Sequence, residues 1–264
     1  TIKHFTLKPA NASPIIFPSL SEQQQVGSFF KQLDDTIALH QRKLNLLKLL
    51  KQTYLNTLFA QNGENSPALR FAGFSEPWEQ RKLGELAEVK TGKAFGSADF
   101  NDDGEYLVVT NKNIQDDING ITSVGDRIDI FEETILNNYL LSGNNILVTM
   151  DGVNIGKTGK YSNEKAVLAQ RVGRLNSEQF EFIYQVTNNN KFLSEMNKLS
   201  VGNAIKHISL KQISDYSFEA PINKVEQKKI GTCFKHLDDT IALHKQKVAH
   251  LQSMKSIFLN KMFV

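Results

Sequence analysis

Two long segments, one near each end of the chain, share a repeating pattern of apolar and polar residues. In the first segment, from Glu22 to Ala60, apolar residues recur with a period of seven, and neither Pro nor Gly occurs after Gly27. With Phe30 at heptad position a, the a and d sites are Val26, Phe30, Leu33, Ile37, His40, Leu44, Leu47, Lys51, Tyr54 and Leu58. Such a pattern is typical of a helix that packs along another helix. It predicts one helix of about 35 residues, roughly 50 Å long at 1.5 Å per residue.

The second segment, from Glu226 to Val264, repeats the first. The octapeptide LDDTIALH occurs at residues 33–40 and 237–244, and 19 of the 39 positions aligned at an offset of 204 are identical. The match continues upstream, where TIKHFTLK at residues 1–8 aligns with AIKHISLK at residues 204–211. If the residues between the segments form one compact domain, the first helix ends near the start of the second. We therefore expect the two helices to run antiparallel as equivalent halves of a pseudo-twofold spacer.

The charged residues of the octapeptide allow two interpretations. The Asp pairs at 34–35 and 238–239 could be metal ligands, but their e and f positions favour solvated faces. His40 and His244 at d could also pair as ligands, although polar residues at such sites more often fix the register of a helix pair. No metal site is predicted.

Three leucines lie outside the a/d seam. Leu39, Leu46 and Leu243 occupy position c, where an apolar residue needs another surface to cover it. Single exposed leucines are common, but these three form a second apolar stripe. We interpret this leucine stripe as a docking face for partner helices.

The residues between the two segments form a different kind of structure. A polar connector with Gly and Pro at residues 61–75 precedes a domain that extends to Pro221. Strand-like runs occur at residues 105–110, 144–150 and 166–175, and helical runs at 177–186 and 190–199. The pattern predicts one mixed α/β domain.

Charge is sorted along this domain. Residues 66–217 contain 16 Lys and Arg against 20 Asp and Glu, and acidic residues crowd the segment 99–117. Between residues 157 and 174, by contrast, Lys and Arg are opposed in the sequence only by Glu164. We predict a DNA-binding face made of Lys93, Lys157, Lys160, Gln170, Arg171 and Arg174. Gln170 is the candidate for a base contact, because its amide can pair bidentately with adenine.

The stretch DGVNIGKTGKY at residues 151–161 imitates a phosphate-binding loop. That loop needs four residues between its first Gly and the Gly-Lys-Thr triplet, whereas only three separate Gly152 from Gly156. A Gly-rich turn between two strands is therefore expected. The chain also lacks an adenine-methyltransferase motif, a methyl-donor loop and a nucleophile elbow. These features predict a protein without catalytic residues of its own.

Composition sets the remaining limits. The 264 residues carry a net charge of only +3, and the single Cys233 excludes an internal disulfide. No apolar run approaches the ~20 residues that span a bilayer, and the first residues do not resemble a signal peptide. We expect a soluble, cytoplasmic protein with no membrane partner.

Several of these segments together resemble the specificity subunit of type I restriction-modification systems. The resemblance covers essentially the whole chain and rests on PALRFAGFSEPWEQRKLGEL, DGVNIGKTGKY, AVLAQRVGRL, NAIKHISLKQISDYSFEAP and VEQKKIGTCFKHLDDTIALHKQK. It implies an α+β protein with one mixed α/β target-recognition domain and two conserved long helices that form an antiparallel coiled coil. It also implies that the protein binds one half of a split double-stranded DNA site and docks methyltransferase subunits and an endonuclease/translocase subunit. S-adenosylmethionine, ATP and Mg²⁺ would belong to those partners, so the chain itself needs no cofactor.

The chain departs from this family in one respect. Family members usually begin with a complete first recognition domain, of which only a tail is expected here. The predicted segments are the tail at 1–18, the first spacer helix at 19–60, the linker at 61–75, the recognition domain at 76–221 and the second spacer helix at 222–264. Because one recognition domain matches only half of a split site, we also expect a homodimer. The alternative function is a coiled-coil assembly protein whose central domain binds another protein.

Overall fold

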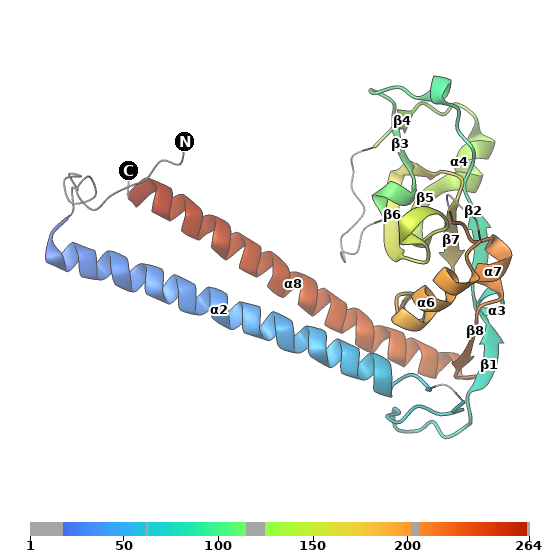
Figure 1. Ribbon diagram of the computed structural model, residues 1–264, viewed down its shortest axis with the longest axis horizontal. Coiled ribbons are helices and arrows are strands. Elements are labelled where there is room, and N and C mark those ends of the chain that lie inside the picture. Colours follow the sequence, from blue (N-terminus) through green and yellow to red (C-terminus); the bar gives the residue numbers. More distant parts are fainter. Residues whose placement is uncertain (1–17, 62, 115–124, 202–205, 263–264) are drawn as a thin grey trace, which may run out of the picture. The chain divides into compact units, whose positions relative to one another are not determined.

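The computed structural model describes residues 18–61, 63–114, 125–201 and 206–262 (Figure 1). These residues fall into two compact units, one made of the residues up to Leu46 with those from Leu243 onward, the other of Leu47–Ala242. Residues 1–17 of the tail expected at the start of the chain lie outside the described residues, as do Ala204 and Ile205 of the upstream repeat. The five segment boundaries drawn from the sequence stay a prediction.

The two heptad segments are long helices, α2 at Leu20–Thr57 and α8 at Lys224–Met262. Between residues 26 and 50 of α2, every position outside the a and d sites is exposed, whereas the a and d sites are half-buried or buried. The heptad register is therefore confirmed.

Contacts between the helices confirm that they run antiparallel. Asp34 forms an ion pair with Lys255, and further along α2 His40 contacts His244, with 3.0 Å between the two Nδ1 atoms. As the residue number increases along α2, the number of the contacting residue in α8 decreases (Figure 1). Asp34 and Lys255 correspond to Asp238 and Lys51 in the repeat, and these two residues also form an ion pair. The repeated sequence produces the same ion pair twice, and His40 meets its own counterpart.

The unit at Leu47–Ala242 contains the α/β domain. The main sheet has the strand order β2-β7-β5-β6-β3-β4, in which only the β3–β6 pair is parallel. Its strands are β2 at Glu88–Thr91, β3 at Tyr106–Val109, β4 at Arg127–Ile128, β5 at Leu140–Thr149, β6 at Thr158–Leu168 and β7 at Val172–Asn176. A second, two-stranded sheet pairs β1 at Glu79–Lys82 with β8 at Ser217–Ala220.

Short helices complete the domain. They are α3 at Leu83–Leu86, α4 at Glu133–Tyr139, α5 at Phe180–Thr187, α6 at Asn190–Leu199 and α7 at Leu210–Ser214, with single 3₁₀ turns at Ser97–Asp99, Asn111–Asn113 and Gly152–Asn154. The expected mixed α/β domain and its two helical runs are confirmed. The run at 166–175, which the sequence suggests as one strand, is instead split between β6 and β7 by a turn at residues 169–171.

An aromatic cluster joins the C-terminal end of α2 and the N-terminal part of α8 to the domain. Phe59 lies 5.6 Å from Phe182 of α5 and 5.9 Å from Phe234 of α8, measured between ring centroids, and it makes an edge contact with Trp78. Phe182 and Phe234 are fully buried. Aromatic pairs of this kind add to the free energy gained by burying their surfaces. The spacer helices and the domain therefore share one hydrophobic core within this unit.

Asp238 corrects one interpretation of the octapeptide. We expected both Asp pairs on solvated faces, and Asp34, Asp35 and Asp239 are indeed exposed. Asp238 is buried, because its carboxylate lies 2.6 Å from Lys51 Nζ and accepts a hydrogen bond of 3.1 Å from the Gln185 amide of α5. Identical residues thus have different surroundings in the two copies.

Candidate nucleic-acid interface

Several loops at strand ends of the main sheet are held together by hydrogen bonds. The Met150 N–H lies within hydrogen-bond distance of the Arg171 carbonyl and the Asn111 side-chain oxygen, and Gln170 N–H donates to the Lys93 carbonyl at 2.8 Å. Gly152 N–H donates to the Lys206 carbonyl at 3.1 Å. These bonds connect residues 92–93, 110–112, 150–157, 169–171 and 206–207, which we call the loop edge.

Glycine is required where the first of these loops begins. A Cβ atom on Gly92 would lie 2.0 Å from the Leu168 carbonyl oxygen, far inside van der Waals contact. Because the missing side chain allows this approach, Lys93 can pair with Ala169 directly after β6. Gly92 therefore brings Lys93 beside the β6–β7 turn.

The loop edge is basic. It carries Lys93, Lys112, Lys157, Arg171 and Lys206, and its one carboxylate belongs to Asp151. Lys112 and Lys206 were missed by the sequence analysis because they lie far from the basic run at 157–174. Only their proximity in the fold, which the sequence pattern does not give, could have identified them.

Four predicted DNA-binding residues lie at the loop edge, namely Lys93, Lys157, Gln170 and Arg171. Gln170 is exposed at the turn between β6 and β7, next to Arg171. Arg171 Nη1 donates a hydrogen bond of 3.1 Å to Asp151. The structure therefore brings together residues that are up to 78 positions apart in the sequence.

Lys160 and Arg174 lie elsewhere. Lys160 pairs with Ile146 of β5, whereas Arg174 pairs with the next residue, Leu147. Directly paired residues share a face of the sheet and successive residues alternate, so the Lys160 and Arg174 side chains point to opposite faces. These two residues cannot belong to a single face of the sheet.

The surroundings of these two side chains also differ from those of the loop edge. Lys160 forms an ion pair with Glu181 and lies 4.5 Å from the centre of the Tyr184 ring. Arg174 donates to the carbonyls of Leu140 and Asn138, and desolvation by burial lowers the pKa of its guanidinium. Their role in DNA binding stays a prediction.

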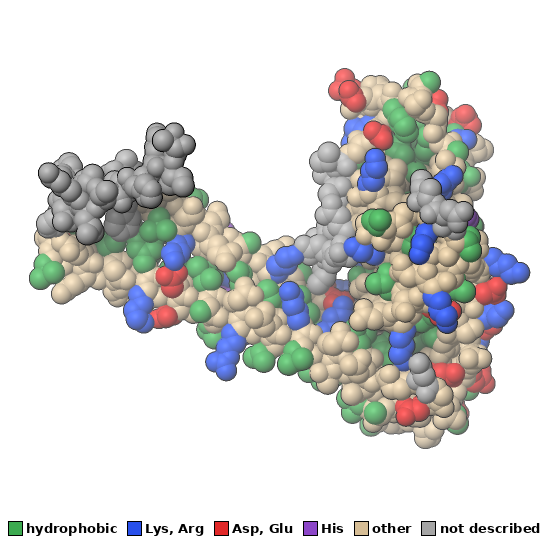
Figure 2. Space-filling model, in the orientation of Figure 1, with side chains coloured by type: hydrophobic (Ala, Val, Ile, Leu, Met, Phe, Trp, Pro, Cys, Tyr) green, Lys and Arg blue, Asp and Glu red, His purple; other side chains and the backbone are tan. Residues whose placement is uncertain are grey.

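The sequence suggested that Glu164 alone opposes the basic run. In the fold, Lys160 has Glu181, Lys165 has Glu105 at 3.3 Å, and Arg171 has Asp151 as partners. The count along the sequence holds, but carboxylates distant in the sequence are close in space and add partners that it does not include. Figure 2 shows both acidic side chains and Lys and Arg spread over the visible face of the domain.

The leucine stripe is exposed on the helix pair. Leu39, Leu46 and Leu243 each have more than half of their surface accessible. Figure 2 shows hydrophobic side chains at the surface of the two helices. The exposure agrees with position c of the heptad, and a partner for the stripe stays a prediction.

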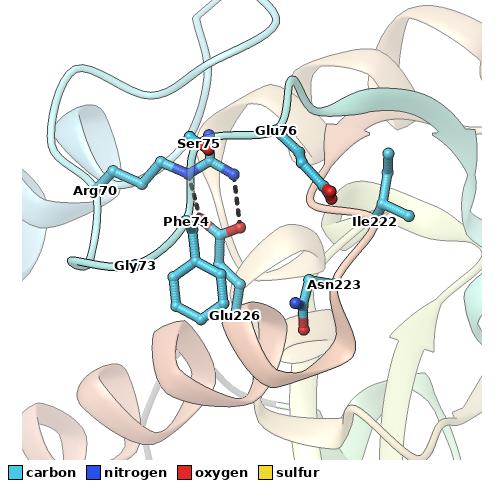
Figure 3. Close-up of a pocket in the computed structure, with 8 residues that line it drawn as sticks. All are labelled: Arg70, Gly73, Phe74, Ser75, Glu76, Ile222, Asn223 and Glu226. Carbon is cyan, nitrogen blue, oxygen red and sulfur yellow. Dashed lines mark hydrogen bonds and ion pairs between the residues drawn. The ribbon is translucent and has the colours of Figure 1, made fainter.

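A small pocket of about 130 Å³ lies where the connector meets the first turn of α8 (Figure 3). There Arg70 donates two hydrogen bonds to Glu226, at 2.7 and 2.8 Å, and Glu226 is almost fully buried. The same bidentate contact raises the pKa of Arg70. Because the two charges neutralise each other, this contact anchors the connector and leaves little free charge for a ligand.

Comparison with known proteins identifies the family. The type I restriction modification DNA specificity domain matches residues 1–49 and 75–253. This chain belongs to that specificity family. The type I restriction enzyme MjaVIII specificity subunit of Methanocaldococcus jannaschii is 24% identical over 274 aligned residues, which cover 98% of this chain and 63% of the relative. The chain thus spans less than two thirds of that specificity subunit.

Solved structures of specificity subunits share the fold. The HsdS subunit from Thermoanaerobacter tengcongensis is 18% identical with a TM-score of 0.59, covering 94% of this chain and 60% of its own. The S subunit of a type I restriction-modification system from M. genitalium is 15% identical with a TM-score of 0.61, covering 93% of this chain and 62% of its own. The α+β fold with long helices, expected from the sequence, is therefore confirmed. Within the described ranges, no helix has the length and apolar character needed to cross a bilayer.

Proposed function

We propose that this chain binds one half of a split double-stranded DNA site and positions methyltransferase subunits, which carry the chemistry together with S-adenosylmethionine. A motor endonuclease would use ATP in the same complex. The observation that supports DNA binding is the loop edge, where five hydrogen-bonded segments carry five basic side chains and a single carboxylate. Clustered Lys and Arg are typical of surfaces that neutralise phosphates.

Salt dependence tests this proposal. Binding of the full chain to duplex DNA should weaken steeply as salt rises, because phosphate contacts release counterions. Lys112→Ala and Lys206→Ala should each flatten the slope of log K against log salt by about one unit and lower affinity similarly on all sequences. Lys82→Ala, a surface lysine of β1 paired with Asp215, is the control and should leave the slope unchanged.

Two results would contradict DNA binding at the loop edge. Salt-insensitive binding, or no duplex binding, would favour the coiled-coil assembly protein. An equal slope for the wild type and the Lys112→Ala/Lys206→Ala double variant would place the DNA on another surface. Lys160 and Arg174 would then be the next residues to test.

The leucine stripe is the proposed docking face for the methyltransferase. Leu39→Glu and Leu243→Glu should abolish co-purification with the cognate methyltransferase, because each puts a charge into an apolar interface. Substitutions of exposed residues usually change stability by less than about 0.5 kcal/mol, so circular dichroism should remain that of the wild type. Leu20→Glu, at an exposed leucine of the same helix, should leave co-purification intact. Co-purification of both stripe variants would refute the docking face.

We further propose that two copies of the chain act together. Gly231, Phe234 and Asp238 are buried in the α/β unit. A Cβ added to Gly27, the counterpart of Gly231, would by contrast have none of the described residues within 4 Å. A recognition domain of a second copy could cover this open face of α2. Since oligomers of identical chains usually have twofold symmetry, the complex should methylate a palindromic split sequence. Light scattering with the methyltransferase and sequencing of methylated adenines test this, and an asymmetric or unsplit motif would exclude it.

A further inference from the structure

The turn between β6 and β7 holds an arginine in an unfavourable backbone conformation. Among the described residues, Arg171 is the one non-glycine residue with a positive φ, at 65°. Residues other than Gly, Asn and Asp rarely adopt a positive φ, because their Cβ atom comes too close to the backbone. Gly would adopt this conformation without strain. Such strain persists where the surroundings enforce it, and it is concentrated at functional sites.

The Arg171 side chain is held by a chain of hydrogen bonds. Its Nη1 donates to Asp151 Oδ2 at 3.1 Å, and the Asn111 amide donates to Asp151 Oδ1 at 3.3 Å. The Asn111 side-chain oxygen in turn accepts from Met150 N–H at 3.3 Å. Asp151 is 14% exposed, whereas Arg171 is 65% exposed. A nearly buried carboxylate therefore orients a guanidinium that extends into solvent.

This arrangement distinguishes two uses of an arginine. A phosphate contact tolerates many geometries, and a flexible lysine can also provide it as a point charge. A base contact does not, because two N–H groups must meet the O6 and N7 acceptors of guanine in one plane. Asp151 accepts from only one nitrogen of Arg171, Nη1, so the guanidinium has further N–H groups for a second partner. Fixing the orientation in advance lowers the entropy lost on binding.

We propose that Arg171 recognises a guanine of the half-site in the major groove, with Asp151 and Asn111 as positioning residues. This inference rests on the proposed DNA-binding function and names the residue that distinguishes one sequence from another. Gln170 precedes Arg171 and is also exposed. It is therefore placed to contact the neighbouring base pair.

Selection from a random duplex library tests the proposal. The full chain, co-purified with its methyltransferase, should enrich a motif with an invariant guanine. Arg171→Lys keeps the charge but loses the planar pair of donors, so it should reduce the preference for that guanine by about 10- to 100-fold while other positions keep theirs. Asp151→Asn should reduce the same preference by a smaller factor, and should have no further effect in the Arg171→Lys background.

Two further variants separate recognition from folding. Arg171→Gly relieves the positive-φ strain, so it should melt at or above the wild-type temperature and still lose the guanine preference. Arg81→Lys, which alters another arginine–carboxylate pair on β1, should leave the motif unchanged. A merely structural Arg171 would instead lower the melting temperature on replacement by Gly and leave the motif intact.

The outcomes distinguish the inference from the function on which it rests. If the wild type binds no duplex or enriches no motif, the proposed function fails and the inference fails with it. If the wild type enriches a motif that Arg171→Lys leaves unchanged, or if this variant weakens all sequences equally, only the guanine assignment is overturned.

Discussion

Replacing Asp238 by Ala should lower the free energy of unfolding by about 3–5 kcal/mol, because it leaves the Lys51 ammonium buried without its partner. The Asp238 side chain is 5% exposed, lies 2.6 Å from Lys51 Nζ and also accepts from the Gln185 amide. Asp34→Ala, the same substitution in the other copy of the octapeptide, should change stability by less than about 1 kcal/mol. Its carboxylate is 51% exposed, although its distance to Lys255 is also 2.6 Å.

Urea unfolding of the two variants measures the difference. Because the substitution and the ion-pair distance are the same, burial by the domain is the main variable between them. A double variant, Lys51→Met with Asp238→Leu, removes both charges and should recover most of the lost stability. Equal destabilisation by Asp238→Ala and Asp34→Ala would show that burial beneath α5 does not control the strength of this pair.

Gly231→Ala should also destabilise the protein, by about 1–3 kcal/mol. A Cβ at this position of α8 would lie 2.7 Å from the Phe182 backbone nitrogen and 2.9 Å from Glu181 Cβ, so α5 would have to move. Gly27→Ala should instead stabilise α2 by up to about 1 kcal/mol, because Ala favours the helix. In the part of the chain that the structure describes, nothing lies within 4 Å of the new methyl group.

Thermal unfolding at low protein concentration tests whether Gly231→Ala lowers and Gly27→Ala raises the stability of the chain. The same pair of variants also tests the homodimer, since a recognition domain packed on α2 would approach Gly27 as α5 approaches Gly231. Gly27→Ala should then weaken self-association while it raises the stability of the single chain. A loss of stability at low concentration would mean that another part of the chain already contacts Gly27.

The sequence predicts the helix pair well because the heptad pattern extends over many residues. The seven-residue period continues past Leu44 and Leu47, and the burial of a and d sites follows from it. Short strands carry less information. The run at 166–175 has no Gly or Pro before Gly173, and nothing in its pattern marks the turn that Arg171 makes with a positive φ.

The candidate site could be predicted only in part. A local charge count detected Lys157 and Arg171 because they lie in one basic run. It could not place Lys112 and Lys206 beside them, since five separate segments form the loop edge. The burial of Asp238 could not be predicted either, because Asp34 lies in the same octapeptide and is exposed. What covers a helix face is decided by other segments of the chain.

The contact between His40 and His244 has a consequence for the symmetry of the spacer. A residue that meets its own counterpart lies on the twofold axis, and a hydrogen bond across 3.0 Å needs one nitrogen that carries hydrogen and one that does not. The two rings therefore cannot be in the same tautomeric state while the bond exists. The octapeptide is identical in the two helices, but a single hydrogen atom between the two rings belongs to one histidine at a time. The two histidines become equivalent only as the rings exchange roles.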